Sequence, residues 1–170
     1  MSIRKILSSD HNIMTAAAIF VSFCALAVSV YQSVILRNQQ YASVWPYIEP
    51  GVQYSNHTFQ LNIQNKGTGP AIIKSIHLEL DGSPVTDYKD FMEKLLKEKR
   101  FQSMSIAPIQ NSVISANGSV QMLAAELPDS LLIKSADFPQ RTKIVICYCS
   151  IFGDCWNFID GEVTKCKECK

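Results

Sequence analysis

The pattern of hydrophobic and polar positions separates the N-terminal part of the chain from the rest. Residues 13–36 read IMTAAAIFVSFCALAVSVYQSVIL, a run of 24 residues without a charged side chain. About 20 apolar residues are enough for a helix to cross the ~30 Å hydrocarbon core of a bilayer. The alternative, a buried core helix, is usually shorter. We therefore expect a transmembrane helix over residues 13–36.

A cleaved signal peptide is a second interpretation of the same segment. Arg4 and Lys5 provide a positive N-terminal region, and Ala25-Leu26-Ala27 has the small-x-small pattern of a cleavage site. Apolar residues continue for nine positions after Ala27, and the whole run is about twice as long as the hydrophobic region of a signal peptide. These features favour an anchor that is retained.

The basic residues near the two helix ends predict the orientation of the helix. Arg4 and Lys5 lie before it, whereas Arg37 follows it closely and the next basic residue is Lys66. Because Lys and Arg collect on the cytoplasmic side, residues 1–12 are expected in the cytoplasm. The remaining chain would be periplasmic or extracellular, on a single-pass protein of the plasma (inner) membrane.

One face of the predicted helix carries small residues, namely Ala18, Ser22, Ala25 and Ser29. Small side chains let two helices approach closely in lipid, which predicts helix packing and a homo-oligomer through this face. The alternative is that Ala and Ser are common in such helices and carry no contact.

The pattern changes to a period of two beyond Pro50, after a short stalk over residues 37–46. The segment TFQLNIQN alternates apolar and polar side chains, as does AIIKSIHLEL. Such alternation is typical of half-buried β-strands. DYKDFMEKLLKEKR has helical spacing instead, and Asp87 is a good N-cap for that helix.

The C-terminal half continues as strands. NSVISANGSVQMLA indicates a hairpin with Asn117-Gly118 in its turn, and RTKIVICYCS is a β-branched strand to which CWNFID pairs back. About seven short strands with one inserted helix predict a mainly β protein, whose body over residues 47–160 is a small immunoglobulin-like β-sandwich. An α+β layered fold is the alternative. Residues 161–170 are expected to form a cysteine-containing tail.

Composition and charge limit the classes of partner. The chain carries a formal net charge of +1, and from Tyr41 onward thirteen Lys and Arg stand against fourteen Asp and Glu. A nucleic-acid-binding domain usually carries a basic patch or arm, so we expect no nucleic-acid partner. We also find no phosphate-binding loop, nucleophile elbow or zinc-protease helix, which leads us to expect no enzyme and no cofactor.

Five cysteines lie near the C-terminus: Cys147, Cys149, Cys155, Cys166 and Cys169. Cys149 and Cys155 flank a five-residue turn, so a bridge between them would close the last hairpin. Cys147 lies on the same strand face as Cys149, within reach of Cys166 or Cys169 in the tail. An oxidising compartment outside the cytoplasm favours these disulfides, and one of the five cysteines then stays free or pairs with another chain.

Zinc is the alternative to disulfides. Cys147, Cys149, Cys166 and Cys169 offer four thiolates, the number that a tetrahedral zinc site accepts. Free, redox-active thiols are a third interpretation of the same residues. A cytoplasmic location of the body would favour the metal or the thiols.

The layout of the chain resembles a class of uncharacterised bacterial single-pass membrane proteins. The resemblance rests on the N-terminal anchor, the Trp45-Pro46 dipeptide and the N-x-G-x-G-P-A turn from Asn65 to Ala71. It covers most of the chain and implies a small β-domain outside the cytoplasm, tethered to the membrane.

These observations predict a non-enzymatic interaction or scaffold domain that is anchored in the lipid bilayer. It would act as an accessory subunit that binds a protein partner in or outside the membrane. The alternative is a thiol-redox or metal-binding membrane protein that uses the C-terminal cysteines.

Overall fold

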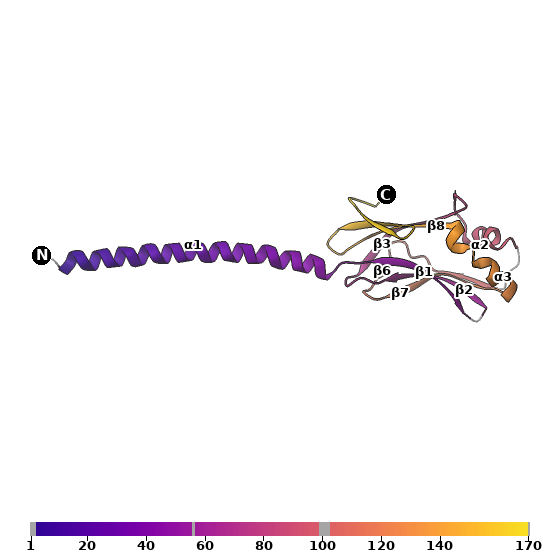
Figure 1. The fold of residues 1–170 in the computed structure, drawn as a ribbon, viewed down its shortest axis with the longest axis horizontal. Helices are drawn as coiled ribbons and strands as arrows, with labels where there is room; N and C mark the ends of the chain where they lie inside the picture. The colour runs from indigo at the N-terminus through magenta and orange to yellow at the C-terminus, as the bar shows by residue number, and fades with distance from the viewer. Residues whose placement is uncertain (1–2, 56, 99–102, 170) are drawn as a thin grey trace. The chain divides into compact units, whose positions relative to one another are not determined.

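The structure is a computed structural model that describes residues 3–55, 57–98 and 103–169, with side chains described from residue 13 onward. The chain divides into two compact units, Met1–Ala42 and Ser43–Lys170. The first unit is a helix, and the second is a β-body that carries short helices (Figure 1).

Helix α1 (Ile3–Ser43) is continuous and contains one segment long and apolar enough to cross a membrane, Ile13–Ser43. The hydroxyls of Ser22 and Ser29 donate to backbone carbonyls one turn earlier, at 2.8 and 2.9 Å. Polar side chains in this helix therefore find partners within it, as an apolar solvent requires.

The helix is longer at both ends than the apolar run of residues 13–36 that is expected to cross the membrane. Residues expected in the N-terminal segment 1–12 are helical from residue 3, and the predicted stalk is helical as far as Ser43. Arg and Gln are good helix formers, so the polar stretch after Leu36 continues the helix. Pro46 restricts Trp45 to an extended conformation and prevents further helix. The side chains of Arg4 and Lys5 lie outside the described residues.

The body consists of two antiparallel sheets. The first has the strand order β1-β2-β7-β5 and consists of β1 (Ile48–Ser55), β2 (Thr58–Asn65), β7 (Ser119–Glu126) and β5 (Ser103–Ile106). The second has the order β10-β9-β8-β3-β4 and consists of β10 (Glu162–Cys166), β9 (Cys155–Ile159), β8 (Thr142–Cys149), β3 (Ala71–Leu80) and β4 (Ser83–Pro84), with β6 (Val113–Ile114) also paired to β3.

The strand orders define the class of sandwich. An immunoglobulin constant-type domain has strands A-B-E-D in one sheet and C-F-G in the other. Assigned in chain order, β1, β2, β7 and β5 reproduce A-B-E-D, and β3, β8 and β9 reproduce C-F-G. The prediction of a mainly β protein with an immunoglobulin-like sandwich after the apolar helix is confirmed, with β10 as an additional edge strand.

The hydrophobic core contains buried residues from both sheets. Phe59, Leu61 and Ile63 of β2 are fully buried, as the alternation of their strand predicts. Ile146 and Tyr148 of β8 belong to the same core. A change of register in β3 between Ile73 and Ser75 marks a bulge, which the sequence pattern does not reveal.

Among the described residues of the body, three short helices accompany the sheets, where one was expected. Helix α2 (Tyr88–Leu96) is the predicted helix, and its N-cap Asp87 accepts a hydrogen bond of 2.8 Å from the Lys89 amide. Helices α3 (Asp129–Ser135) and α4 (Phe138–Arg141) occupy the connection between β7 and β8. α2 contacts α3 (Figure 1). Residues 99 and 100, expected at the end of α2, lie outside the described residues.

The predicted hairpin around Asn117-Gly118 is wrong. The turn itself exists, because the Gly118 amide donates to the Ser115 carbonyl at 2.9 Å and Asn117 has a φ of 55°. However, β6 before the turn pairs with β3 in the second sheet, whereas β7 after it belongs to the first sheet. The turn therefore carries the chain from one sheet to the other.

The predicted tail over residues 161–170 contains a strand. β10 pairs antiparallel with β9, so that Cys166 lies opposite Cys155 and Lys165 opposite Trp156. Lys165 also forms an ion pair of 2.7 Å with Asp154 in the β8–β9 turn. Among the described residues of this segment, 167–169 follow β10 without regular secondary structure.

Candidate functional site

The candidate site is the group of five cysteines on β8, β9, β10 and the segment after β10. Strand register places Cys149, Cys155 and Cys166 in one row, because Cys149 pairs with Cys155 and Cys155 pairs with Cys166. Cys147 lies two residues before Cys149 and therefore on the same face of β8. Tyr148, between them, points to the core, so the cysteines occupy the outer face of the second sheet.

Two disulfides join four of these cysteines. Cys149 is bonded to Cys155, and Cys147 to Cys169, with Cα–Cα distances of 4.0 and 5.6 Å. The structure thus brings together every cysteine assigned from the sequence, and it selects Cys169 rather than Cys166 as the partner of Cys147. Cys166 and the helix residue Cys24 carry free thiols.

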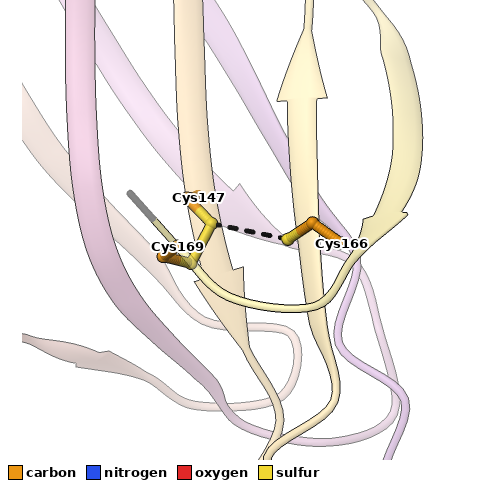
Figure 2. Close-up of side chains that lie close together, drawn as sticks. All are labelled: Cys147, Cys166 and Cys169. Atoms are coloured by element: carbon orange, nitrogen blue, oxygen red, sulfur yellow. Dashed lines mark hydrogen bonds between the residues drawn. A yellow bond between two sulfur atoms is a disulfide. The ribbon is translucent and has the colours of Figure 1, made fainter.

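The free thiol of Cys166 lies beside a disulfide. Its Sγ is 3.8 Å from Cys147 Sγ, and the sulfur atoms of Cys147, Cys166 and Cys169 all lie within 4.8 Å of one another (Figure 2). Cys169 Sγ is in turn 3.8 Å from Cys149 Sγ. The five sulfur atoms therefore form a continuous series of neighbours, in the order Cys166, Cys147, Cys169, Cys149 and Cys155.

Solvent reaches the group of five cysteines at the two residues of the tail, Cys166 and Cys169. Cys147, Cys149 and Cys155 are buried, whereas Cys166 and Cys169 are half-buried. In Figure 2 the segment after β10 runs from Cys166 across to Cys169, which lies next to Cys147. Any reagent or partner thiol therefore meets Cys166 and Cys169 first.

The core side of the same strand is aromatic. Tyr148 is fully buried, and its ring is stacked on that of Trp156 with centroids 5.9 Å apart. Burial raises the pKa of Tyr148 to about 12, so its hydroxyl stays neutral at physiological pH. The cysteine face is thereby backed by a rigid, uncharged layer.

A second feature is a cleft at the end of the sandwich that carries α4. Its volume is about 720 Å³. Its lining combines the charged pair of Asp81 and Arg141 with apolar and aromatic side chains, which include Val52, Tyr54, Leu61, Phe138, Ile144 and Phe158. The sequence pattern did not predict this cleft, because its walls come from β1, β2, β3, α4, β8 and β9 together.

The motif from Asn65 to Ala71 has a structural role that sequence reasoning missed. Asn65 is fully buried, and a Cβ added to Gly67 or Gly69 would lie 2.3 Å from the Trp45 carbonyl oxygen or 2.0 Å from that of Val44. The turn therefore packs backbone against backbone on the segment that leads from α1 into β1. Gly67 and Gly69 are the residues in the sequence that could have indicated this close approach of two backbone segments.

The chain belongs to the family described as a domain of unknown function, DUF8453, whose profile matches residues 9–160. The match includes most of α1 and the body as far as β9, together with Cys147, Cys149 and Cys155. Neither the curated proteins nor the solved structures contain a match to the chain.

Proposed function

We propose that this protein is a single-pass membrane protein whose body binds a protein partner outside the cytoplasm, as an accessory subunit without an enzymatic reaction of its own. In this proposal α1 spans the plasma (inner) membrane with the N-terminus in the cytoplasm. The body then lies in the periplasm or outside the cell.

The observation that carries this proposal is the presence of two disulfides in a body that follows a helix of membrane-spanning length. Disulfides persist in oxidising compartments and are rare in the cytosol. The few basic residues favour the same orientation, since only Arg37 follows the apolar segment closely.

Reporter fusions test the orientation. Alkaline phosphatase fused after residue 170 should be active, because that enzyme needs an oxidising compartment, and a cytoplasmic reporter at the same point should be inactive. The opposite pair of activities would contradict the proposal. A fusion after Gln40 serves as the control, because it reports the orientation of α1 without the body.

The cleft supports partner binding. Its lining combines apolar with charged side chains, which is the composition of a surface that accepts a protein segment. A photo-crosslinking residue in place of Lys143, which lines the cleft, should trap the partner in intact membranes. The matched control is Lys89, an exposed lysine on α2. Equal capture from both positions would contradict a partner in the cleft.

We also propose that two copies of α1 pack through Ala18, Ser22, Ala25 and Ser29. The Ser22 and Ser29 hydroxyls bond within their own helix, which leaves these positions small and able to pack closely. Ser22→Leu should abolish a crosslinked dimer in membranes, whereas Phe23→Leu should leave it unchanged.

A thiolate zinc site is the second candidate function. The two non-bonded sulfur contacts, Cys147 to Cys166 and Cys149 to Cys169, both measure 3.8 Å. A tetrahedron with Zn–S bonds of about 2.3 Å has sulfur atoms about 3.8 Å apart, so these two contacts match that spacing. Cys147, Cys166 and Cys169, three members of the alternative ligand set, have sulfur atoms that all lie within 4.8 Å of one another. Zinc analysis of protein purified without reductant tests it, and one equivalent of zinc would favour this candidate over the disulfides.

A further inference from the structure

The two disulfides and the free thiol are arranged as one chain of sulfur atoms. Bonded pairs alternate with contacts of 3.8 Å: Cys166 contacts Cys147, which is bonded to Cys169, and Cys169 contacts Cys149, which is bonded to Cys155. Two separate structural bridges would not require contact with each other or with a thiol. This continuous series of bonds and contacts distinguishes the group from two independent structural disulfides.

We infer that the five cysteines form a thiol–disulfide exchange site, in which the free thiol moves between Cys166, Cys169 and Cys155. The inference goes beyond the proposed function, because partner binding and location require only that the bridges form. It assigns to the tail a covalent chemistry with other proteins' disulfides.

The first step begins at Cys166. Its thiol loses a proton to solvent, and the thiolate attacks Cys147 Sγ. A Cys147–Cys166 bond forms, the Cys147–Cys169 bond breaks, and the electron pair leaves on Cys169, which becomes the thiolate. The number of disulfides is unchanged, so the step consumes neither an oxidant nor a reductant.

The second step follows from the contact between Cys169 and Cys149. The Cys169 thiolate attacks Cys149 Sγ, a Cys149–Cys169 bond forms, and the Cys149–Cys155 bond breaks with Cys155 as the leaving thiolate. Two disulfides and one thiol remain. The pairing with a Cys149–Cys155 bridge is the resting one, because these residues are direct partners across β8 and β9.

Movement of the tail is part of the first step. The sulfur atoms of Cys147, Cys166 and Cys169 form a triangle, whereas exchange proceeds with the three atoms close to a line. Cys166 also lies on β10, separated from β8 by β9. It is half-buried at the last position of an edge strand, so a shift of that strand end can bring it into line.

Exchange changes which cysteine of the tail carries a free thiolate. In the resting pairing Cys169 is bonded to β8 and residues 167–169 are fixed at the sheet. After the first step the thiolate is on Cys169, which is half-buried on the irregular segment after β10 and is accessible there to a disulfide of another protein. Attack on such a bridge would form a mixed disulfide and release one partner thiolate, again with no net oxidation.

The test uses the full-length chain in detergent, purified without reductant, with Cys24→Ser so that only cysteines of the body report. One sample receives excess fast alkylating reagent, and a second receives a slow, limiting reagent for hours at pH 8. Non-reducing peptide mapping then locates the label. We expect the share of label on Cys169 and Cys155 to rise about tenfold or more from the fast to the slow reagent, because exchange has time to run through the thiolate.

The control is the same chain with Cys166→Ser, which removes the thiol that starts the exchange. Label on Cys169 and Cys155 should then be lost. Label confined to Cys166 under slow alkylation, or equal label on Cys169 in the control, would overturn the exchange and leave the proposed function intact. Five free thiols in the starting material would overturn both.

Discussion

The side-chain amide of Asn65 donates a hydrogen bond of 2.8 Å to the carbonyl oxygen of Gly69. The same nitrogen donates to the Ile114 carbonyl, and Oδ1 of Asn65 accepts from the backbone amides of Tyr47 and Gly67. One buried side chain thus connects the start of β1, the β2–β3 turn and β6. This connection fixes the point at which the chain enters the sandwich.

Asn65→Ala should lower the free energy of unfolding by about 3 kcal/mol, because it leaves several buried backbone groups without a partner. Urea denaturation of the full-length protein in detergent measures the change. Asn62→Ala is the matched control in the same strand. Its side chain bonds only to the exposed Gln53, so its effect should stay below about 0.5 kcal/mol. Equal losses at the two positions would contradict the role of Asn65.

Gly69→Ala should destabilise the body by about 3 kcal/mol or more, because the new Cβ would lie 2.0 Å from a backbone atom that cannot move freely. Gly51→Ala in β1 provides the control, since a Cβ there meets no atom within 4 Å. Thermal melts of the two variants decide the matter. If Gly69→Ala and Gly51→Ala have the same melting temperature, the turn does not pack on Val44 in the way described.

The pair of exposed Asp81 and half-buried Arg141 should give the body a pH dependence. Hydrogen bonds from the Arg141 side chain to both Asp81 carboxylate oxygens lower the pKa of Asp81 below its ordinary value of 3.8. A lowered pKa in the folded state means that the stabilisation is present above pH 3.8 and is lost as pH falls through the folded-state pKa.

Asp81→Asn should therefore reduce stability at pH 7, and the difference from the wild type should shrink as pH falls below about 4. Asp160→Asn is a close control, because Asp160 also lies in a turn with positive φ, 48° against 50° for Asp81. Urea midpoints measured between pH 7 and pH 3 test this. A difference that stays constant over that range would exclude the ionised pair as its source.

The two disulfides should contribute unequally to stability. Chain-entropy arguments give about 2 kcal/mol for the short Cys149–Cys155 loop and about 3 kcal/mol for the longer Cys147–Cys169 loop. The sequence separations are 6 and 22 residues. Unfolding of the double variants Cys149→Ser/Cys155→Ser and Cys147→Ser/Cys169→Ser compares them. The reverse order of losses would show that strain or packing outweighs loop entropy.

Much of the fold was predictable from periodicity. Phe59, Leu61 and Ile63 alternate with polar residues, and they are buried as that pattern requires. The strand over 142–149 and its pairing with Cys155–Ile159 followed from β-branched residues on both sides of a short turn. β10 was missed because Val163 is the sole large apolar side chain among Glu162–Cys166, so its sequence shows no alternation.

Long-range pairing was the part that the pattern could not predict. Asn117-Gly118 is a favourable turn, but a turn does not determine which sheet each flanking strand joins, and β6 pairs with β3. Asn65 looked like a turn residue, whereas its partners at Tyr47 and Ile114 come from distant parts of the chain. Among the cysteines, strand register determined that Cys149 pairs with Cys155. The choice between Cys166 and Cys169 depended on the path of the tail.

The most direct test of the central claim is the state of the five body cysteines in living cells. Cells are treated with a membrane-permeant alkylating reagent before lysis, and the protein is then extracted from membranes and mapped without reduction. A disulfide-linked body outside the cytoplasm predicts two bridges, Cys149–Cys155 and Cys147–Cys169, and one alkylated cysteine among the five. Alkylation of all five would place the body in a reducing compartment and contradict the account.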